Sequence, residues 1–372
     1  MASQQTSVAI IGGGVIGVSI AVHLLRQGAP VSLFTEGELV SGASGRSLSW
    51  LNSAGERSRE YHALRMAGID RYRTLHAQDP GRDWLRFDGG LFWANDDDTG
   101  TRARHAYEKA HAYHSHLIGA EGVARLTPNV NIEAVADAAT FNPGEGWVSL
   151  PHLIEHLMQE FRELGGELIA HCGKASVTRD ESGHANGVDT ERAGHHPVDR
   201  VVVACGAQTP EVVAPLGVSI PNASPLSMLV VTTPLEHGVE CVMNTPRAAI
   251  RPNPASSLAV DHDWYEEHIE GDENSGYRIP EAVIEELLDE ASRLVKGSPR
   301  LEAESHKIGY KPIPGDGEPV LGELEAVPGC FVAFTHSGAT LALVVGELLA
   351  DEILSGAKNP MLETFRPERF GT

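Results

Sequence analysis

A glycine-rich turn near the start of the chain has the spacing of a nucleotide-binding site. Gly12, Gly14 and Gly17 match the pattern G-x-G-x-x-G, with Val15 and Ile16 between the last two glycines. In such a pattern the first glycine permits a tight turn and the second lets the backbone approach a pyrophosphate. The third lets helix and strand pack closely. The turn therefore predicts a diphosphate at the positive end of a helix.

The elements around this turn have the order that a dinucleotide site requires. The apolar run 7–13 predicts a buried strand, helical spacing follows, Gly28 ends the helix, and residues 29–34 predict a second strand. That strand is followed by Glu36, whose carboxylate can accept hydrogen bonds from ribose hydroxyls and would repel a 2′-phosphate. The charge of Glu36 argues against NADP and leaves NAD and FAD open.

Three further stretches bear on the choice between NAD and FAD. Residues 41–47 contain small residues and one arginine, and predict a turn around the far side of a pyrophosphate. Residues 199–207 predict a buried strand that ends in small residues, among them Gly206. Residues 331–341 predict a strand that leads into a helix, whose first amides could face a ligand. An NAD dehydrogenase would not need the second and third stretches.

This combination resembles the D-amino-acid oxidase, glycine oxidase and sarcosine oxidase family of FAD enzymes. The resemblance is carried by VAIIGGGVIG with Glu36, SGASGRS, VVVACGAQT, GYKPIPGDGEPVLG and HSGATLAL, from residue 8 to about residue 353. It implies an α/β fold, with a Rossmann-like FAD-binding domain and a second, mixed-sheet α+β substrate domain.

The resemblance also implies which residues hold FAD. Ser44, Arg46 and Ser47 would lie near the pyrophosphate or the flavin ring, and the helix that starts near Gly338 would direct its amides at the flavin pyrimidine. Some sarcosine oxidases attach flavin to a cysteine where this chain has about Gly309, so noncovalent FAD is expected here. The expected cofactor-binding residues are Gly12, Gly14, Val15, Ile16, Gly17, Glu36, Ser44, Arg46, Ser47, Gly206, Gly338, Ala339, Thr340 and Leu341.

Four residues are candidates for the reaction itself. Family members that take amino acids hold the α-carboxylate with an arginine where this chain has Lys311. A lysine offers a point charge and no fork, so Lys311 either binds a carboxylate, signals a different substrate, or pairs with a neighbouring acid. Arg251, before a proline at a predicted strand end, could hold the carboxylate or lie on the surface. Arg46 and His336 are further candidates near the flavin, with a structural role as the alternative for His336.

Other residues carry weaker signals. His262 and Tyr265 either line the substrate pocket or lie in a solvated loop, and Trp50 either packs on the flavin or belongs to the core. Residues 102–116 look helical and contain four histidines. A metal pair of His111 and His114 is less favoured than a solvated helix face, because no carboxylate follows in register.

The predicted FAD-binding domain is discontinuous. It comprises residues 1–85, 145–215 and 305–372, and the substrate-binding domain comprises residues 86–144 and 216–304. Within the second domain, residues 226–233, 248–251 and 257–260 predict strands of a mixed sheet, and residues 280–295 predict an amphipathic helix.

The composition limits the partners. The chain has 29 basic and 51 acidic residues and a net charge of −22, which disfavours nucleic acid and anionic membrane surfaces. Its four cysteines are scattered, no membrane span is expected, and the first residues lack the basic segment of a signal peptide. These features favour the cytoplasm.

Together these observations predict an FAD-dependent oxidoreductase. It would oxidise the C–N bond of a small amine or amino acid by hydride transfer to flavin N5, with O2 or another acceptor taking the electrons. Two alternatives stay open at this point: an FAD-dependent 2-hydroxy-acid dehydrogenase, and a flavoprotein without catalytic activity.

Overall fold

The computed structural model of the 372-residue chain describes residues 5–94, 98–272 and 274–371. The chain divides into two compact units. Unit 1 comprises residues 1–45, 150–225 and 310–372, and unit 2 comprises residues 46–149 and 226–309.

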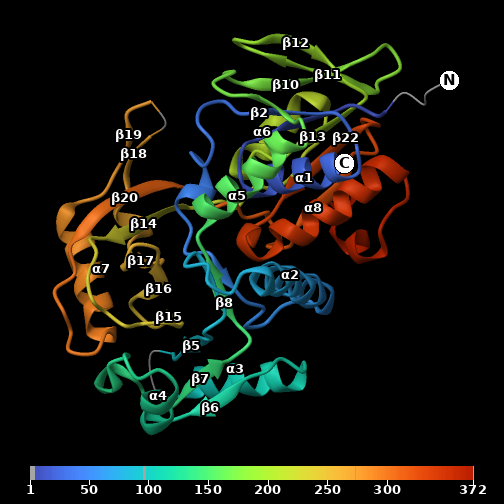
Figure 1. The fold of residues 1–372 in the computed structure, drawn as a ribbon. Coiled ribbons are helices and arrows are strands. Elements are labelled where there is room, and N and C mark those ends of the chain that lie inside the picture. Colours follow the sequence, from blue (N-terminus) through green and yellow to red (C-terminus); the bar gives the residue numbers. More distant parts are fainter. Residues whose placement is uncertain (1–4, 95–97, 273, 372) are drawn as a thin grey trace. The chain divides into compact units, whose positions relative to one another are not determined.

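Unit 1 is built on a six-stranded sheet in the order β21-β22-β13-β1-β2-β9 (Figure 1). All residues of the central strand β1 are buried, as expected for a strand covered on both faces. The neighbours of β1 run parallel to it, with Val8 opposite Val31 on one side and Arg200 on the other. The strands are β1 (Val8–Ile11), β2 (Val31–Phe34), β9 (Glu167–Ile169), β13 (Arg200–Val203), β22 (Cys330–Phe334) and the antiparallel β21 (Val320–Glu323).

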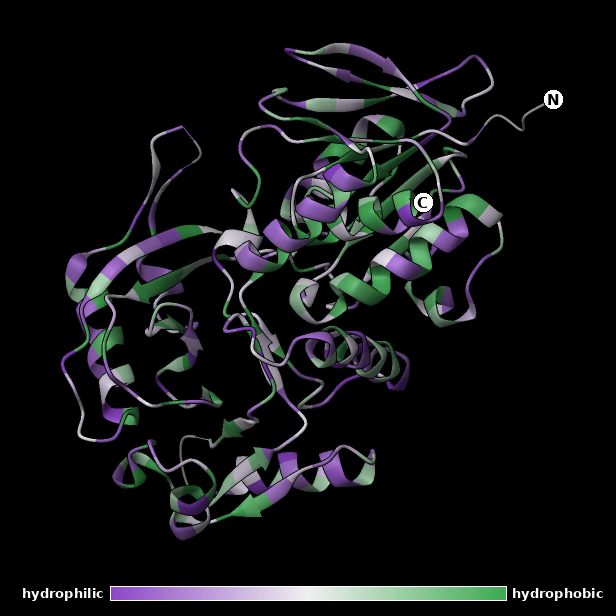
Figure 2. Ribbon diagram, in the orientation of Figure 1, coloured by the Kyte–Doolittle hydropathy of each residue, from purple (hydrophilic) through white to green (hydrophobic). Residues whose placement is uncertain are grey.

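Helices α1 (Val15–Arg26) and α8 (Gly338–Ser355) pack side by side in unit 1 (Figure 1). Their close approach requires Gly346, where an added Cβ would lie 2.3 Å from Ser19 Oγ. Unit 1 also contains α5 (Leu150–Glu163), α6 (Thr209–Val213) and a small sheet of β10 (Ala175–Arg179), β11 (Ala185–Thr190) and β12 (Gly194–Pro197). Figure 2 shows that this small sheet is largely hydrophilic, whereas α8 is mainly hydrophobic.

Unit 2 contains an eight-stranded mixed sheet in the order β20-β14-β17-β16-β15-β5-β7-β6. Helix α7 (Glu281–Leu294) buries Ile284, Leu287 and Leu288 in the core that includes the sheet residues Val230, Ile250 and Val260. The strands are β5 (Gly90–Phe92), β6 (His116–Ile118), β7 (Ala139–Asn142), β14 (Leu226–Thr232), β15 (Val242–Asn244), β16 (Ala249–Asn253), β17 (Ser257–Asp261) and β20 (Ala303–Tyr310). The remaining elements are α2 (Arg59–Gln78), α3 (Thr99–Ala110), α4 (Ala120–Leu126) and the hairpin β18 (Glu270–Asp272) and β19 (Gly276–Arg278).

A three-stranded sheet explains where unit 2 begins. Strand β8 (Gly146–Val148) pairs with both β3 (Trp50–Leu51) and β4 (Leu85–Arg86). Residues 46–85, which the sequence assigned to the FAD-binding domain, therefore pack in unit 2. A short strand of two residues carries too little hydrophobic pattern to reveal this pairing in advance.

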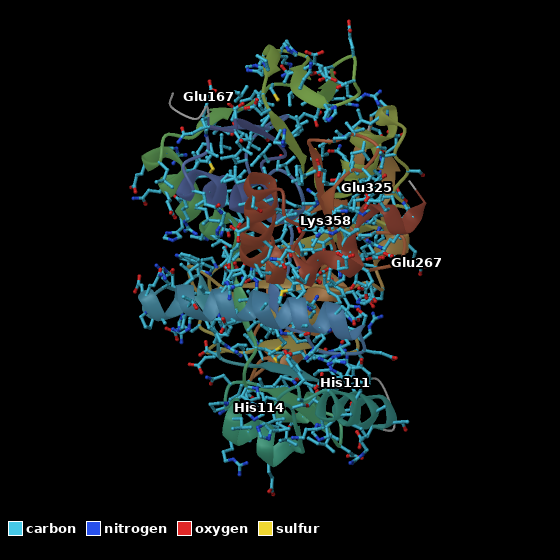
Figure 3. The ribbon with its side chains drawn as sticks, turned by 90° about the vertical axis from the view of Figure 1, so that its right-hand side faces the viewer. His111, His114, Glu167, Glu267, Glu325 and Lys358 are labelled. Atoms are coloured by element: carbon cyan, nitrogen blue, oxygen red, sulfur yellow. The ribbon has the colours of Figure 1, made fainter. Side chains whose placement is uncertain are left out.

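The histidine-rich segment 102–116 is helical only in its first part. Helix α3 ends at Ala110, and His116 already belongs to β6, so the expectation of a helix over the whole segment was wrong. His111 and His114, labelled in Figure 3, thus do not share a helix face. Among the described residues, no group of three or more His, Cys, Asp or Glu side chains could hold a metal ion.

Within the described part of the chain, no helix has both the length and the apolar character needed to cross a membrane.

Candidate functional site

The glycine-rich turn of unit 1 has a backbone that only glycine permits. Gly12 has a φ of +123°, and a Cβ added there would lie 2.3 Å from the carbonyl oxygen of Ala204. A Cβ on Gly17 would lie 2.1 Å from the carbonyl oxygen of Gly12. At both positions the backbone of the turn lies too close to a carbonyl oxygen to leave room for a Cβ. Neither glycine can therefore be replaced without moving the backbone.

The second glycine of the pattern has open space in front of it. Apart from the chain neighbours of Gly14, a Cβ added there would have one atom of the described residues within 4 Å, Ser44 Oγ at 3.4 Å. Ser44 is buried, and its hydroxyl accepts a 3.0 Å hydrogen bond from the backbone N–H of Val15. The first-turn N–H groups of Ile16 and Gly17 have no partner within the helix, and the turn carries no acidic side chain. The turn therefore fits a diphosphate.

A second helix begins beside the first. Ser337 precedes α8, and a Cβ added to Gly338, the first residue of α8, would lie 3.9 Å from Ile16 Cγ1. The amino ends of α1 and α8 thus lie next to each other, and their positive dipole ends would suit an anionic ligand. Thr340 and Leu341 are buried, whereas the side chain of His336 is exposed just before the helix.

The carboxyl end of β2 presents Glu36 to solvent. Glu36 is exposed and lies close to two thiols, Cys172 and Cys205. Burial, together with the charge of Glu36, raises the pKa of Cys205 to about 12, so this thiol stays protonated at neutral pH. The carboxylate of Glu36 is placed where the sequence pattern requires a ribose ligand.

The loop after β13 adds another small residue to this edge. Gly206 has a φ of +59°, and a Cβ added there would lie 3.5 Å from Pro312 Cγ. Lys311, the residue before this proline, is half-buried, and its backbone N–H donates to the carbonyl of Pro225 at 2.9 Å. Unit 1 thus brings together the glycine turn, Ser44, Glu36, Gly206 and the start of α8 along the carboxyl ends of its parallel strands. This arrangement fits a dinucleotide.

In unit 2, Arg251 of β16 is a buried cation that has no acidic partner among the residues the structure describes. Its side chain is 2% exposed. Nε donates to the carbonyl of Leu48, and Nη1 donates to Pro252 O at 2.7 Å and to Asn253 Oδ1 at 2.9 Å. These acceptors are neutral, and burial lowers the pKa of Arg251 to about 9. The alternative of a surface arginine is therefore wrong.

Trp147 of β8 lies against Arg251. The guanidinium carbon of Arg251 is 5.1 Å from the centroid of the Trp147 ring. Trp147 is 3% exposed, and its Nε1 has no hydrogen-bond partner among the described residues. Sequence analysis did not single out Trp147, because a large apolar residue is ordinarily part of the core.

Arg46 and Ser47 belong to unit 2, whereas Ser44 belongs to unit 1. The guanidinium of Arg46 packs against Gly309, where an added Cβ would lie 2.4 Å from Arg46 Cζ. Burial lowers the pKa of Arg46. The hydroxyl of Ser47 accepts a 3.1 Å hydrogen bond from the backbone N–H of Ser49.

A buried carboxyl group in unit 2 was not found by sequence analysis. Glu145 is 0% exposed and accepts hydrogen bonds from Tyr113 OH at 2.6 Å and Trp50 Nε1 at 2.8 Å. Its carboxyl lies over Gly90, where an added Cβ would be 2.0 Å from Glu145 Oε2. Burial raises the pKa of Glu145 to about 7. In the sequence Glu145 lies between two glycines and has the appearance of an exposed turn residue.

Tyr265 and His262 have structural partners. Tyr265 is fully buried, and its hydroxyl contacts Asp261 Oδ1 and the backbone of Met228. Of the two alternatives for Tyr265, the solvated loop is therefore wrong. His262 Nε2 lies 3.1 Å from the carbonyl oxygen of Thr245.

Comparison with known proteins agrees with this architecture. The family described as FAD dependent oxidoreductase (DAO) matches residues 7–352. The chain is 28% identical over 369 residues to a glycine oxidase of Geobacillus kaustophilus, covering 94% of this chain and 93% of the relative.

Two solved structures have the same fold. The crystal structure of glycine oxidase from Geobacillus kaustophilus superposes with a TM-score of 0.81 at 22% identity, covering 99% of both chains. The structure of L-amino acid deaminase from Proteus myxofaciens superposes with a TM-score of 0.84 at 16% identity, covering 98% of this chain and 94% of that one.

The fold and the family match define an α/β enzyme of the flavin-binding class, as the sequence predicted. The family match spans nearly the whole chain, and the protein belongs to the DAO family of FAD-dependent oxidoreductases. Its cofactor is FAD.

Proposed function

We propose that the protein oxidises the C–N bond of a small amine or amino acid. Bound FAD supplies the hydride acceptor, its N5 atom, and O2 or another acceptor takes the electrons afterwards. The resulting imine hydrolyses in water. Proteins similar to this chain are named glycine oxidase and L-amino acid deaminase, and both names denote enzymes that act on amino acids.

The observation that carries this proposal is the buried cation of unit 2. Arg251 places a guanidinium in the protein interior, where the described part of the chain gives it three neutral acceptors and no carboxylate. Taking a charge out of water is costly unless an opposite charge accompanies it. A substrate carboxylate supplies that charge, and it also fixes the amine end of the substrate relative to Arg251.

Three other residues are proposed to assist. Lys311 is proposed to offer a positive charge to an anionic group, as a point charge rather than a fork. Arg46 and His336 are proposed to act near the flavin, where positive or hydrogen-bonding groups stabilise the charge that reduction brings.

We propose that the residues along the edge of unit 1 hold FAD. Its diphosphate would lie at the glycine turn and Ser44, its adenosine ribose at Glu36, and its flavin near Gly206 and residues 338–341. Ser47 is proposed as a further FAD-binding residue.

FAD is proposed to be bound without a covalent link. The guanidinium of Arg46 fills the space that a side chain at position 309 would need. The four cysteines are free thiols, and burial raises the pKa of each of them. A thiol of raised pKa is a poor nucleophile at neutral pH.

The proposal is tested by anaerobic reduction of the bound flavin. FAD-loaded protein is mixed with separate panels of amino acids, amines without a carboxylate, and 2-hydroxy acids, and the visible flavin absorbance is followed. The proposal expects bleaching by at least one member of the first two panels. Bleaching by hydroxy acids alone, or by no compound in any panel, would overturn it.

A further inference from the structure

Arg57, in the loop before α2, is a cation whose guanidinium donates to no residue that the structure describes. Its backbone N–H donates to Tyr107 OH at 3.3 Å, and its backbone carbonyl accepts from the same hydroxyl at 2.8 Å. These two bonds hold the main chain and leave the side chain unused. The Nε atom is buried and has no hydrogen-bond partner among the described residues. Buried donors in folded proteins are nearly always paired, so Nε requires an acceptor.

Two other arginines lie near Arg57 and have the acceptors that it lacks. Arg65 donates from Nε to the carbonyl of Asn52 at 2.8 Å and from Nη2 to Asn52 Oδ1 at 3.0 Å. Arg104 donates from Nε to Glu108 Oε1 at 2.9 Å, and the side chain of this acid is 1% exposed. The described residues give the guanidinium of Arg57 neither a carbonyl nor a carboxylate.

The surroundings of Arg57 carry positive charge. The guanidinium carbons of Arg57 and Arg65 lie 5.5 Å and 5.4 Å from the centroid of one ring, that of Tyr61. Burial, together with the charges of Arg65 and Arg104, lowers the pKa of Arg57 to about 10. The pKa of His62 is lowered by burial and also by neighbouring cations, Arg65 and Arg57 among them. A chain with a net charge of −22 thus gathers cations at this place.

The ring of Tyr61 does not replace an anion. An aromatic face attracts a guanidinium, but here one ring is shared by two guanidinium groups and does not remove the repulsion between them. A water molecule would accept from Nε and would bring no negative charge. An oxyanion does both, because its oxygen atoms accept from a guanidinium in pairs and its charge offsets that of the arginines.

We propose that Arg57 is the centre of a binding site in unit 2 for a small, doubly charged oxyanion, either inorganic phosphate or the phosphate group of a small ester. The guanidinium of Arg57 supplies the hydrogen bonds, and Arg65 supplies a second positive charge nearby. A doubly charged ion fits because more than one guanidinium acts at this place. The inference goes beyond the proposed oxidation and does not depend on it, because Arg57 has no part in that reaction.

The first experiment follows thermal unfolding of FAD-saturated protein in rising inorganic phosphate, at an ionic strength held constant with sodium chloride. Saturation with FAD keeps phosphate from the proposed diphosphate site. The wild-type Tm is expected to rise by about 2–5 °C, with half of the effect on the order of 1 mM phosphate. Arg57→Met keeps an apolar stem and removes the cation, so most of this rise should be lost. The matched control is Arg59→Met, at an exposed position of α2, which should respond like the wild type.

The same variant without phosphate separates a binding site from a structural arginine. In chloride alone, Arg57→Met should be at least as stable as the wild type, because the substitution relieves the repulsion from Arg65 and Arg104. An Arg57→Met protein that is less stable by several degrees, equally with and without phosphate, would overturn the proposal, since Arg57 would then act only in folding. Equal phosphate responses of Arg57→Met and the wild type would overturn it as well.

The second experiment is calorimetric titration of phosphate and, separately, of glycerol phosphate into the FAD-saturated wild type. Saturable binding of either at one per chain supports the proposal, and the tighter of the two identifies the source of the oxyanion. Arg57→Lys keeps the charge and loses the fork, so it should bind about 10-fold more weakly, and it serves as the variant if Arg57→Met does not fold. Absence of saturable binding of both compounds by the wild type would overturn the proposal and leave the proposed oxidation untouched.

Discussion

Glu145 should make the stability of the protein fall as the pH rises from about 5 to 8. Its folded-state pKa is raised from 4.5 to about 7, because desolvation outweighs the hydrogen bonds from Tyr113 and Trp50. The Arg104 charge acts in the opposite direction, and the Glu108 charge adds to the effect of burial. The folded protein therefore holds a proton that the unfolded chain has released across this pH range.

The sign and size of the effect follow from linkage. A raised folded-state pKa contributes stability that is fully present below the unfolded pKa near 4.5 and is lost as the pH rises through about 7. The difference between the two pKa values corresponds to roughly 3 kcal/mol of unfolding free energy.

The substitution Glu145→Gln tests this effect directly. Glutamine keeps the shape of the side chain and an acceptor oxygen but cannot ionise. The unfolding free energy of both proteins is measured with urea in the presence of saturating FAD. The difference between the variant and the wild type should shift in favour of the variant by roughly 3 kcal/mol from pH 5 to pH 8.5. The matched control Glu121→Gln, at an exposed position of α4, should not change the pH dependence. A Glu145→Gln variant whose stability follows the same pH curve as the wild type would refute the reasoning.

Three further predictions concern unit 1. Gly17→Ala should abolish FAD retention and destabilise the protein, because the new Cβ would collide with the carbonyl oxygen of Gly12. The control Gly37→Ala should retain FAD, because no described atom lies within 4 Å of a Cβ at that position. Flavin absorbance of the protein after gel filtration measures retention in both variants. Glu36→Gln should weaken FAD binding about 10-fold and leave FMN binding unchanged in fluorescence titrations, since only FAD carries the adenosine ribose; equal losses for both flavins would contradict this role. Arg366→Met should lower the unfolding free energy measured in urea by about 3–5 kcal/mol, because the buried carboxylate of Glu352 loses the arginine that forms an ion pair with it. A decrease of less than about 1 kcal/mol would contradict this prediction.

The glycine turn and the two helices beside it in unit 1 could be predicted from the sequence. The glycine spacing fixes a backbone that other residues cannot adopt, as the contacts of Gly12 and Gly17 demonstrate. The helix that starts at Val15 and the one that starts at Gly338 were both predicted from apolar spacing and glycine positions. These features depend on residues that are close together in the sequence, so a short sequence pattern predicts them.

The buried polar groups of unit 2 could not be predicted from the sequence, because they depend on contacts between distant segments. Arg251 was a candidate, but its burial could not be read from the sequence. The partners of Glu145 come from positions 50 and 113, and the pairing of β3 with β8 brings Trp50 near it. The place of Trp147 against Arg251 likewise depends on packing between β8 and β16. No hydrophobic period or motif spacing encodes such contacts.

The most direct test of the account is the visible spectrum of the purified protein after incubation with FAD and gel filtration. The account predicts that flavin absorbance elutes with the protein at one FAD per chain and is released intact by denaturation. Protein that elutes colourless, with all of the FAD in the small-molecule fraction, would contradict it.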